Sequence, residues 1–216
     1  MLRADYDALT RQDWDNVVCL SADEGVGKSL LTLHALEIWL EFRGINDKKL
    51  DYDDAKKILN RFMGIKFIDW CLVLKGLDHA DMNIYDEAGD SLTGKHATAK
   101  TSRLVEDSYT VIRGLNLMSI FVLPSIFDLA PFFRKRRVRT LWHLSKRGLC
   151  HVWHKPKRLK LMQLNEARPI KDYMLEPPLF SFEVPKYEGI FLKPYKEMKD
   201  NKMYEVLDDM YKQAKK

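Results

Sequence analysis

The sequence feature that most constrains the fold is the stretch Ser21–Ser29, which reads Ser-Ala-Asp-Glu-Gly-Val-Gly-Lys-Ser. It follows an apolar run, residues 17–20, and precedes a segment with helical apolar spacing, residues 30–42. Gly25 and Gly27 let the backbone turn so that its N–H groups point inward, and the first turn of the following helix adds further donors. This order of strand, glycine-bearing loop, Gly-Lys-Ser and helix is typical of a loop that binds phosphates.

Two residues of this loop have defined expected roles with ATP and Mg²⁺. We predict that the Lys28 ammonium reaches the β- and γ-phosphates and that the Ser29 hydroxyl holds Mg²⁺. Ala22 stands where the motif usually has glycine, and alanine fits there if its φ is negative. Chance is the alternative, but average residue usage gives such a match in about 1–2% of chains of this length. The residues expected to bind the nucleotide are Asp23, Glu24, Gly25, Val26, Gly27, Lys28, Ser29 and Leu30.

The composition is that of a globular chain with its own core. Of the 216 residues, 46% are hydrophobic and 31% are charged, and the formal net charge is +5, which allows an anionic partner without requiring one. Three scattered cysteines favour a reducing, cytoplasmic location without a disulfide framework. The N-terminus lacks the apolar segment of a signal peptide, and the longest apolar region, residues 115–133, contains prolines and polar residues that suit no membrane span.

The pattern of apolar residues predicts an α/β fold with a mainly parallel central sheet and flanking helices. Residues 138–144 and 149–153 flank Lys146-Arg147-Gly148, which predicts a C-terminal β-hairpin. Residues 67–77 are expected to form a strand that runs into a helical turn. Further strands are expected at 16–20, 81–85, 115–123 and 158–164, and helices at 30–42, 53–62, 97–113 and 198–211.

We divide the chain into two parts. Residues 1–166 are expected to form the core with its basic hairpin region. Residues 167–216 are expected to form a proline-rich extended arm and an amphipathic helix that packs on this core, with Met203, Val206, Leu207 and Met210 on one face.

The second candidate site is the pair Asp86-Glu87, at the end of a short apolar strand. An aspartate there, downstream of a phosphate-binding loop, can hold Mg²⁺, and the adjacent glutamate can polarise a water for attack on the γ-phosphorus. A pair of solvated carboxylates at a strand end is the alternative.

A guanidinium from a neighbouring subunit can stabilise the charge of a phosphoryl-transfer transition state. Arg113, between a helix and a strand, and Arg103 on the same helix are the candidates. The alternative for either is a surface ion pair.

Residues 129–165 contain eleven Lys and Arg residues and no Asp or Glu. Trp142 and Trp153 are interleaved with these cations, which favours contact with a nucleic-acid backbone. A solvated basic face is the alternative. The candidates for this contact are Arg134, Lys135, Arg136, Arg137, Lys146 and Arg147.

These motifs together resemble the HerA/FtsK superfamily of P-loop ATPases. The resemblance covers roughly residues 14–155 and is closest in layout to viral genome-packaging ATPases and to zonular-occludens-toxin-like proteins of phages and plasmids. It is carried by Ala22-x4-Gly27-Lys28-Ser29, by Asp86-Glu87-Ala88, and by Arg113-Gly114-Leu115-Asn116 before an apolar strand that ends in Leu123-Pro124-Ser125.

The resemblance implies a RecA-like core of the ASCE type, a homo-oligomeric, hexameric ring, and ATP-driven movement of double-stranded DNA. By position, Lys28 and Ser29 match the phosphate and Mg²⁺ residues, Asp86 and Glu87 match the second motif, and Arg113 matches the region of the trans-acting arginine. One departure concerns the strand end, where the family often has a glutamine that senses the γ-phosphate and this chain has Pro124-Ser125.

Two functions follow as hypotheses. The first is an ATPase that translocates or packages DNA, in which Lys28, Glu87 and Arg113 are catalytic, with a capsid or virion protein as a further partner. The second is a nucleotide-gated virion-assembly adaptor, in which the basic region binds protein or acidic lipid. Toxin-like relatives usually carry a membrane span, so its expected absence favours the first. A small-molecule kinase is less consistent with the hairpin pattern around Arg147.

Overall fold

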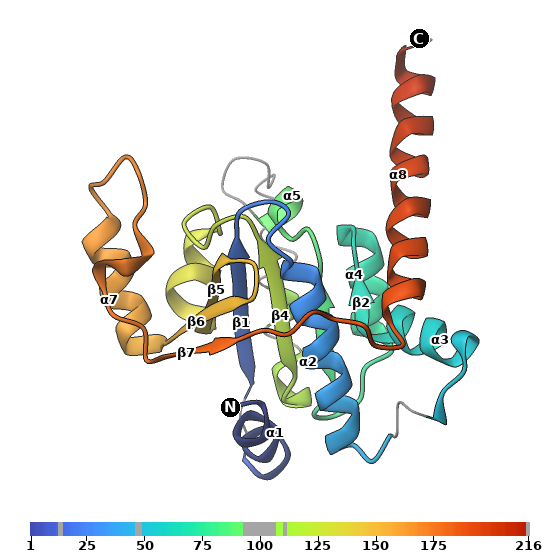
Figure 1. The fold of residues 1–216 in the computed structure, drawn as a ribbon, viewed down its shortest axis with the longest axis horizontal. Helices are drawn as coiled ribbons and strands as arrows, with labels where there is room; N and C mark the ends of the chain where they lie inside the picture. The colour runs from blue at the N-terminus through green and yellow to red at the C-terminus, as the bar shows by residue number, and fades with distance from the viewer. Residues whose placement is uncertain (13–14, 46–48, 93–106, 110–111, 215–216) are drawn as a thin grey trace.

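The computed structural model describes residues 1–12, 15–45, 49–92, 107–109 and 112–214. At its centre is a sheet that has seven strands within these residues, in the order β2-β3-β4-β1-β5-β6-β7 (Figure 1). The strands are β1 Asn16–Ala22, β2 Met63–Gly64, β3 Met82–Tyr85, β4 Met118–Leu123, β5 Val138–Lys146, β6 Leu149–His154 and β7 Phe180–Glu183. The helices are α1 Leu2–Arg11, α2 Lys28–Phe42, α3 Tyr52–Phe62, α4 Phe67–Lys75, α5 Gly89–Leu92, α7 Lys155–Asn165 and α8 Leu192–Ala214.

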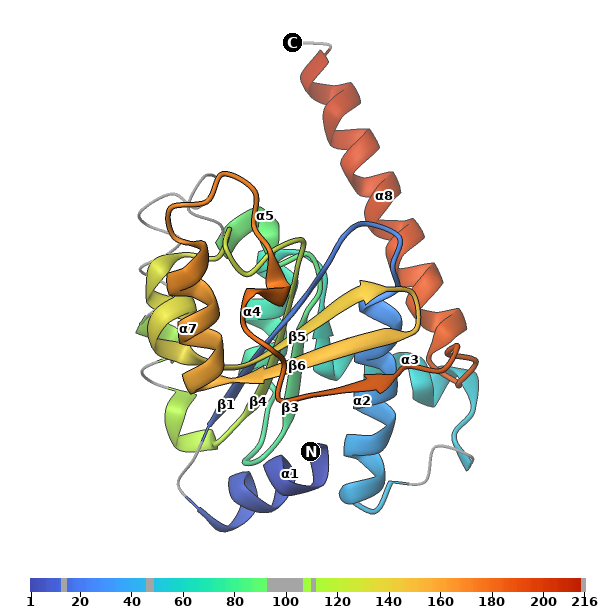
Figure 2. The same cartoon turned by 60° about the vertical axis from the view of Figure 1, so that its left-hand side comes forward.

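The sheet is parallel from β2 through β5 and becomes antiparallel at the hairpin. β1 pairs in parallel with β4 on one side and with β5 on the other. β6 runs antiparallel to β5, and β7 runs antiparallel to β6 (Figure 2). This confirms the expected α/β fold, with its mainly parallel sheet and its hairpin. The strand β7 is an addition, because a four-residue strand carries little local signal.

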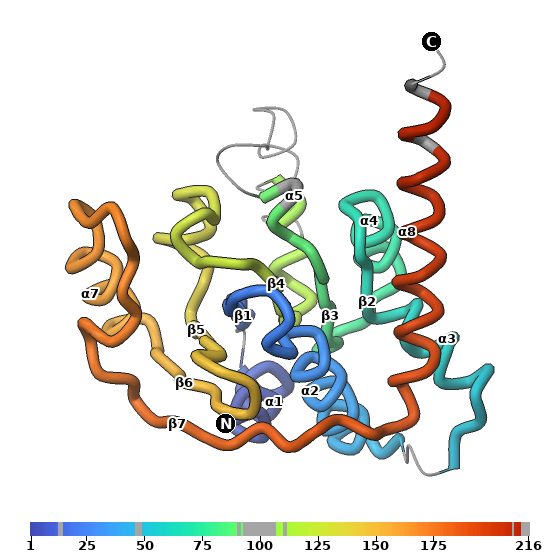
Figure 3. Tube along the Cα trace, turned by 45° about the horizontal axis from the view of Figure 1, so that its top comes forward, coloured from blue at the N-terminus to red at the C-terminus, as the bar shows by residue number. Residues whose placement is uncertain are grey.

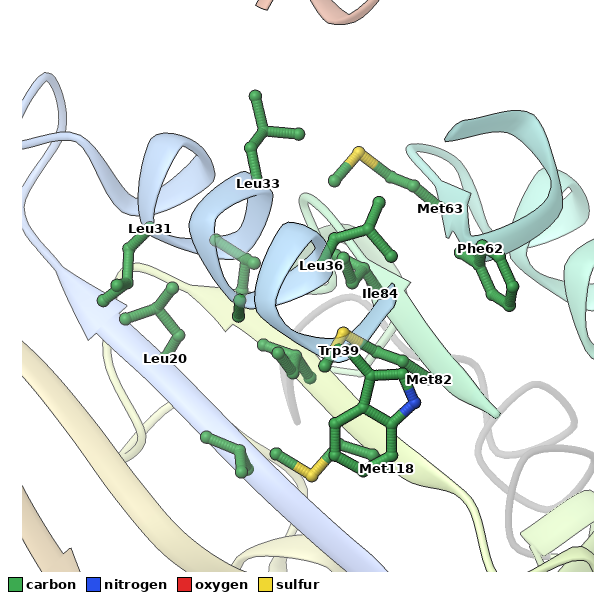
Figure 4. Packing of buried hydrophobic residues seen from close by; sticks show 14 of the residues in the cluster. Leu20, Leu31, Leu33, Leu36, Trp39, Phe62, Met63, Met82, Ile84 and Met118 are labelled. Atoms are coloured by element: carbon green, nitrogen blue, oxygen red, sulfur yellow. The ribbon is translucent and has the colours of Figure 1, made fainter. Parts of the chain in front are cut away.

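Both faces of the sheet are covered, as the apolar character of β1 requires. All seven residues of β1 are buried, and they alternate between two apolar clusters: Val18 and Leu20 face one, and Val17 and Cys19 face the other. Figure 4 shows the first cluster, in which Leu36 and Trp39 of α2 pack over Met82 and Ile84 of β3.

Two local expectations are corrected by the structure. Residues 158–164 lie in helix α7, not in a strand, and Pro156 occupies its first turn, where proline is well tolerated. Residues 67–75 form helix α4 throughout. Helix α1, at the N-terminus, is not among the expected helices. Most of the helix expected at 97–113, including Arg103, lies outside the described residues.

The C-terminal region crosses the molecule and then leaves it. Figure 3 traces the chain from β7 along α2 to α8, and Tyr187 Oη donates to Glu37 Oε1 of α2 across 2.5 Å. Helix α8 packs on the body near Tyr195 and then projects outward (Figure 1). Its expected apolar face does not pack on the core, since Met203, Val206, Leu207 and Met210 are 51%, 43%, 52% and 62% exposed. None of the helices among the described residues has both the length and the apolar character that a membrane crossing requires.

Candidate functional site

The candidate site forms where parallel strands end at one edge of the sheet. The loop at residues 23–27 follows β1, Asp86 and Glu87 follow β3, and Pro124 and Ser125 follow β4. Because β4 lies between β1 and β3, these three segments converge at the carboxyl edge, where α/β sheets bind ligands. This strand order, with the glycine-bearing loop directly after β1, fits the expected RecA-like P-loop fold.

The loop has the backbone conformation that the sequence predicts. Gly25 and Gly27 adopt φ values of +74° and +106°, in the left-handed region that favours glycine. A Cβ at either position would meet nothing within 4 Å, so conformation and not space requires glycine there. Ala22 ends strand β1, fully buried, and its φ is not positive, so alanine is compatible with this position. Gly27 also caps α2, whose first turn supplies N–H donors.

Lys28 lies over its own loop. Its ammonium donates to the carbonyl oxygens of Ala22 and Asp23 across 2.7 and 2.9 Å. Burial lowers the pKa of Lys28, against the opposing effect of nearby carboxylates, of which Asp86 is the strongest. A lysine held by carbonyl oxygens of this loop is within reach of any phosphate bound there.

Ser29 and Asp86 are in direct contact. Ser29 Oγ lies 3.1 Å from Asp86 Oδ1 and 3.2 Å from Oδ2. Asp86 is 1% exposed, and its backbone N–H donates to Gly64 O across 2.9 Å. A serine hydroxyl and a buried carboxylate are the oxygen donors that Mg²⁺ prefers, so these two residues fit the ion predicted for them.

The side chain of Glu87 is partly exposed to solvent. It adopts φ +65°, a strained conformation for a residue with a side chain, and such strain is concentrated at functional sites. The N–H of the next residue, Ala88, donates to Val122 O across 3.0 Å and so fixes the turn. The side chain of Glu87 is 51% exposed and contacts the Lys199 ammonium.

Two residues of α8 that the sequence analysis missed complete the surroundings of Asp86. Tyr195 Oη donates to Asp86 Oδ2 across 2.8 Å, and Lys199 Nζ lies 3.1 Å from the same oxygen. Burial and the Asp86 carboxylate raise the pKa of Tyr195. Burial alone would lower the pKa of Lys199, but the carboxylates of Asp86 and Glu87 raise it overall. No sequence motif links α8 to this site.

Ser125 stands at the strand end where the family often has a glutamine that senses the γ-phosphate, and its hydroxyl contacts that of Tyr173. Their hydroxyl oxygens are 3.0 Å apart. The Tyr173 ring stacks on His143 at 3.7 Å between centroids, and His143 Nδ1 lies 3.0 Å from Ser21 Oγ at the base of the loop. Side chains therefore connect the end of β4 to the end of β1.

Arg113 is not brought to this site. It is exposed in the turn Ile112–Leu115, which precedes β4, so it lies at the opposite end of the sheet from the loop. The six residues of β4 span about 20 Å. A role for Arg113 in a neighbouring subunit's site stays a prediction.

Residues 129–165, which contain no Asp or Glu and are called the basic block below, are partly neutralised by acidic residues from other parts of the chain. Arg137 lies 3.6 Å from Asp15, and its guanidinium covers the Tyr109 ring. Lys160 lies 2.7 Å from Glu176. Several of the cations therefore have structural partners, including the fully buried Arg158, which donates to the carbonyl oxygen of Arg134.

The six nucleic-acid candidates do not form one patch. Arg134, Lys135, Arg136 and Arg137 precede β5, whereas Lys146 and Arg147 follow or end it. The nine residues of β5 separate the two groups by about 30 Å. Lys135 and Arg136 are exposed, while Arg134 donates to Phe127 O across 2.7 Å. Arg147, at the hairpin tip, donates to Gly25 O of the loop at residues 23–27 across 3.1 Å.

Comparisons with solved structures find a similarity to a viral protein. Two similar structures are those of the genome packaging NTPase B204 from Sulfolobus turreted icosahedral virus 2, in complex with AMPPCP and with AMP. They are 12% and 14% identical to this chain, with TM-scores of 0.42 and 0.43, and each match covers 68% of this chain and 95% of the other. The sequence motifs resemble the same class of viral protein. A similarity of this size carries no argument about activity.

Neither a scan of the sequence against protein-family models nor a search of the curated proteins finds a match. The chemistry of the site therefore rests on its own geometry.

Proposed function

We propose that this chain binds ATP with Mg²⁺ and hydrolyses it as part of a homo-oligomeric, hexameric motor that moves or packages double-stranded DNA. The observation that supports this most is the contact of Ser29 with Asp86 beside the left-handed loop of Gly25 and Gly27. It unites two motifs that are 57 residues apart in the sequence.

We propose a role for each residue on the basis of its position. The N–H groups at the start of α2 and the Lys28 ammonium bind the phosphates. Ser29 and Asp86 hold Mg²⁺, which when bound would neutralise charge on the phosphate oxygens. Glu87, next to Asp86 and partly open to solvent, accepts a proton from the attacking water.

Binding and hydrolysis are tested with separate variants. Lys28→Ala should weaken binding of a fluorescent ATP analogue by about 10- to 100-fold, because a charged hydrogen bond is worth roughly 1.5–3 kcal/mol. Glu87→Gln should keep binding and lower phosphate release by at least about 100-fold. Glu188→Gln removes a charge from an exposed acid away from the site and should change neither. Equal binding by wild type and Lys28→Ala would contradict the proposal.

The DNA component needs its own test. Combined Lys135→Ala and Arg136→Ala substitutions should weaken double-stranded DNA binding and reduce the slope of log Kd against log salt by about 2. The control combines Lys57→Ala with Lys186→Ala, which removes the same charge from residues 77% and 83% exposed elsewhere. An unchanged slope in the first variant would show that Lys135 and Arg136 do not contact DNA.

The exposed apolar face of α8 supports a second candidate, the nucleotide-gated assembly adaptor. In that case nucleotide should promote co-sedimentation with anionic liposomes or a virion protein, and DNA should not affect ATP turnover. ATP turnover that DNA stimulates in the wild type, and that is absent in Glu87→Gln, would favour the DNA motor over the assembly adaptor.

A further inference from the structure

Helix α8 places two polar groups directly on the carboxylates of the candidate site. Tyr195 and Lys199 lie one helical turn apart and therefore on the same face. Both contact Asp86 Oδ2, at 2.8 and 3.1 Å, and Lys199 also contacts Glu87 Oε1. The ammonium thus links the proposed metal ligand and the proposed general base.

These contacts conflict with the roles of the two carboxylates. Asp86 Oδ2 is shared by a hydroxyl and an ammonium, so its acceptor capacity is largely used. A divalent cation held by Ser29 and Asp86 would lie beside the Lys199 ammonium, and like charges so close repel in a partly buried site. Glu87 Oε1 likewise faces the Lys199 ammonium, where its proposed role requires it to face a water molecule.

The rest of α8 is attached in a way that permits movement. Beyond Lys199 it is held by ion pairs: Lys202 lies 3.0 Å from Asp69, and Lys66 lies 3.5 Å from Glu205. Partly exposed ion pairs of this kind contribute little to stability. The apolar residues from Met203 to Met210 are exposed and do not anchor the helix.

We propose that α8 is a latch: Lys199 and Tyr195 occupy the carboxylates of Asp86 and Glu87, and binding of nucleotide with Mg²⁺ displaces Lys199 and shifts α8. The position of the exposed C-terminal half of α8 would therefore depend on whether nucleotide and Mg²⁺ are bound at the site. This inference rests on the proposed nucleotide site and adds a conformational output to it.

The first test measures affinity and not turnover. Lys199→Met should tighten binding of a fluorescent non-hydrolysable ATP analogue by about tenfold in Mg²⁺, because it removes the group that competes with the cation. In EDTA the same variant should bind no more tightly than wild type, since loss of a positive charge disfavours an anion. Tyr195→Phe, which keeps the ring, should tighten binding in Mg²⁺ by a smaller factor of about threefold.

Lys202→Met is the matched control. It removes a lysine from the same helix, also paired with a carboxylate and of similar side-chain exposure, 22% against 29% for Lys199. Because Lys202 helps to hold α8 but contacts neither Asp86 nor Glu87, it should change both affinities by less than about twofold. Weaker binding by Lys199→Met in Mg²⁺ would make Lys199 a nucleotide ligand and overturn the latch, and so would unchanged binding.

The second test measures the movement. Spin labels at Glu41→Cys on α2 and Met210→Cys on α8, in a Cys71→Ser background, should change their distance distribution when the analogue and Mg²⁺ are added together. The analogue with EDTA should leave the distribution unchanged. No change in Mg²⁺ while Lys28-dependent binding persists would overturn the latch alone. If neither wild type nor Lys199→Met binds the analogue, the proposed function and the latch both fail.

Discussion

Arg147 donates from Nη2 to the carbonyl oxygen of Gly25 across 3.1 Å, although the two residues are 122 positions apart in the sequence. The β5–β6 hairpin brings the guanidinium to the phosphate-binding loop, because β5 pairs in parallel with β1 and ends at the same edge. An arginine that the sequence assigned to DNA therefore contacts the loop that we propose binds the nucleotide.

We expect Arg147→Ala to affect nucleotide binding more than DNA binding. Loss of this exposed hydrogen bond and of the nearby charge should raise the Kd of a fluorescent ATP analogue by about fivefold, equivalent to ~1 kcal/mol. Lys146→Ala removes the adjacent exposed charge and should change this Kd by less than about twofold. A larger effect of Arg147→Ala on DNA affinity than on nucleotide affinity would instead support the DNA contact predicted from the sequence.

The sequence was sufficient for the parts of the site that depend on contiguous residues. The loop around Gly25 and Gly27 and the carboxylates after β3 each carry a local motif, and parallel strand geometry brings their ends together. Ser29 and Asp86 could therefore be paired without coordinates.

Features that depend on tertiary contacts could not be predicted in the same way. Tyr195 and Lys199 reach Asp86 from a helix more than 100 residues later, and no spacing rule relates them. The basic block looked continuous because Asp15 and Glu176, which neutralise parts of it, lie elsewhere in the sequence. Helix α7 had a local signal in Pro156 at its first turn, but its short apolar run also suits a strand.

His143 is expected to make stability depend on pH. Burial lowers its pKa from 6.5 to about 4, so the unfolded chain binds a proton at a higher pH than the folded chain does. Stability from the neutral imidazole is complete above about pH 6.5 and is lost as the pH falls toward 4. Between pH 7.5 and pH 5 the free energy of unfolding should fall by about 2 kcal/mol from this group alone.

Urea unfolding of wild type and His143→Gln across this range measures the effect. The variant should lack this component of the pH dependence, and NMR titration of the imidazole should show it neutral at pH 5 in the folded protein. The same slope in both proteins would mean that His143 is not the group responsible.

Gly64 is expected to be required by close packing beside Asp86. A Cβ there would lie 2.9 Å from the backbone carbon of Asp69 and closer still to the backbone of Trp70, at the start of α4. Gly64→Ala must move α4 or β2 and should lower the free energy of unfolding by about 2 kcal/mol. Because Gly64 O accepts the Asp86 N–H, this variant should also weaken Mg²⁺-dependent nucleotide binding. Gly76→Ala, whose Cβ would meet only Val73 O at 3.8 Å, should change stability by less than about 0.5 kcal/mol, and an equal loss in both variants would contradict the packing argument.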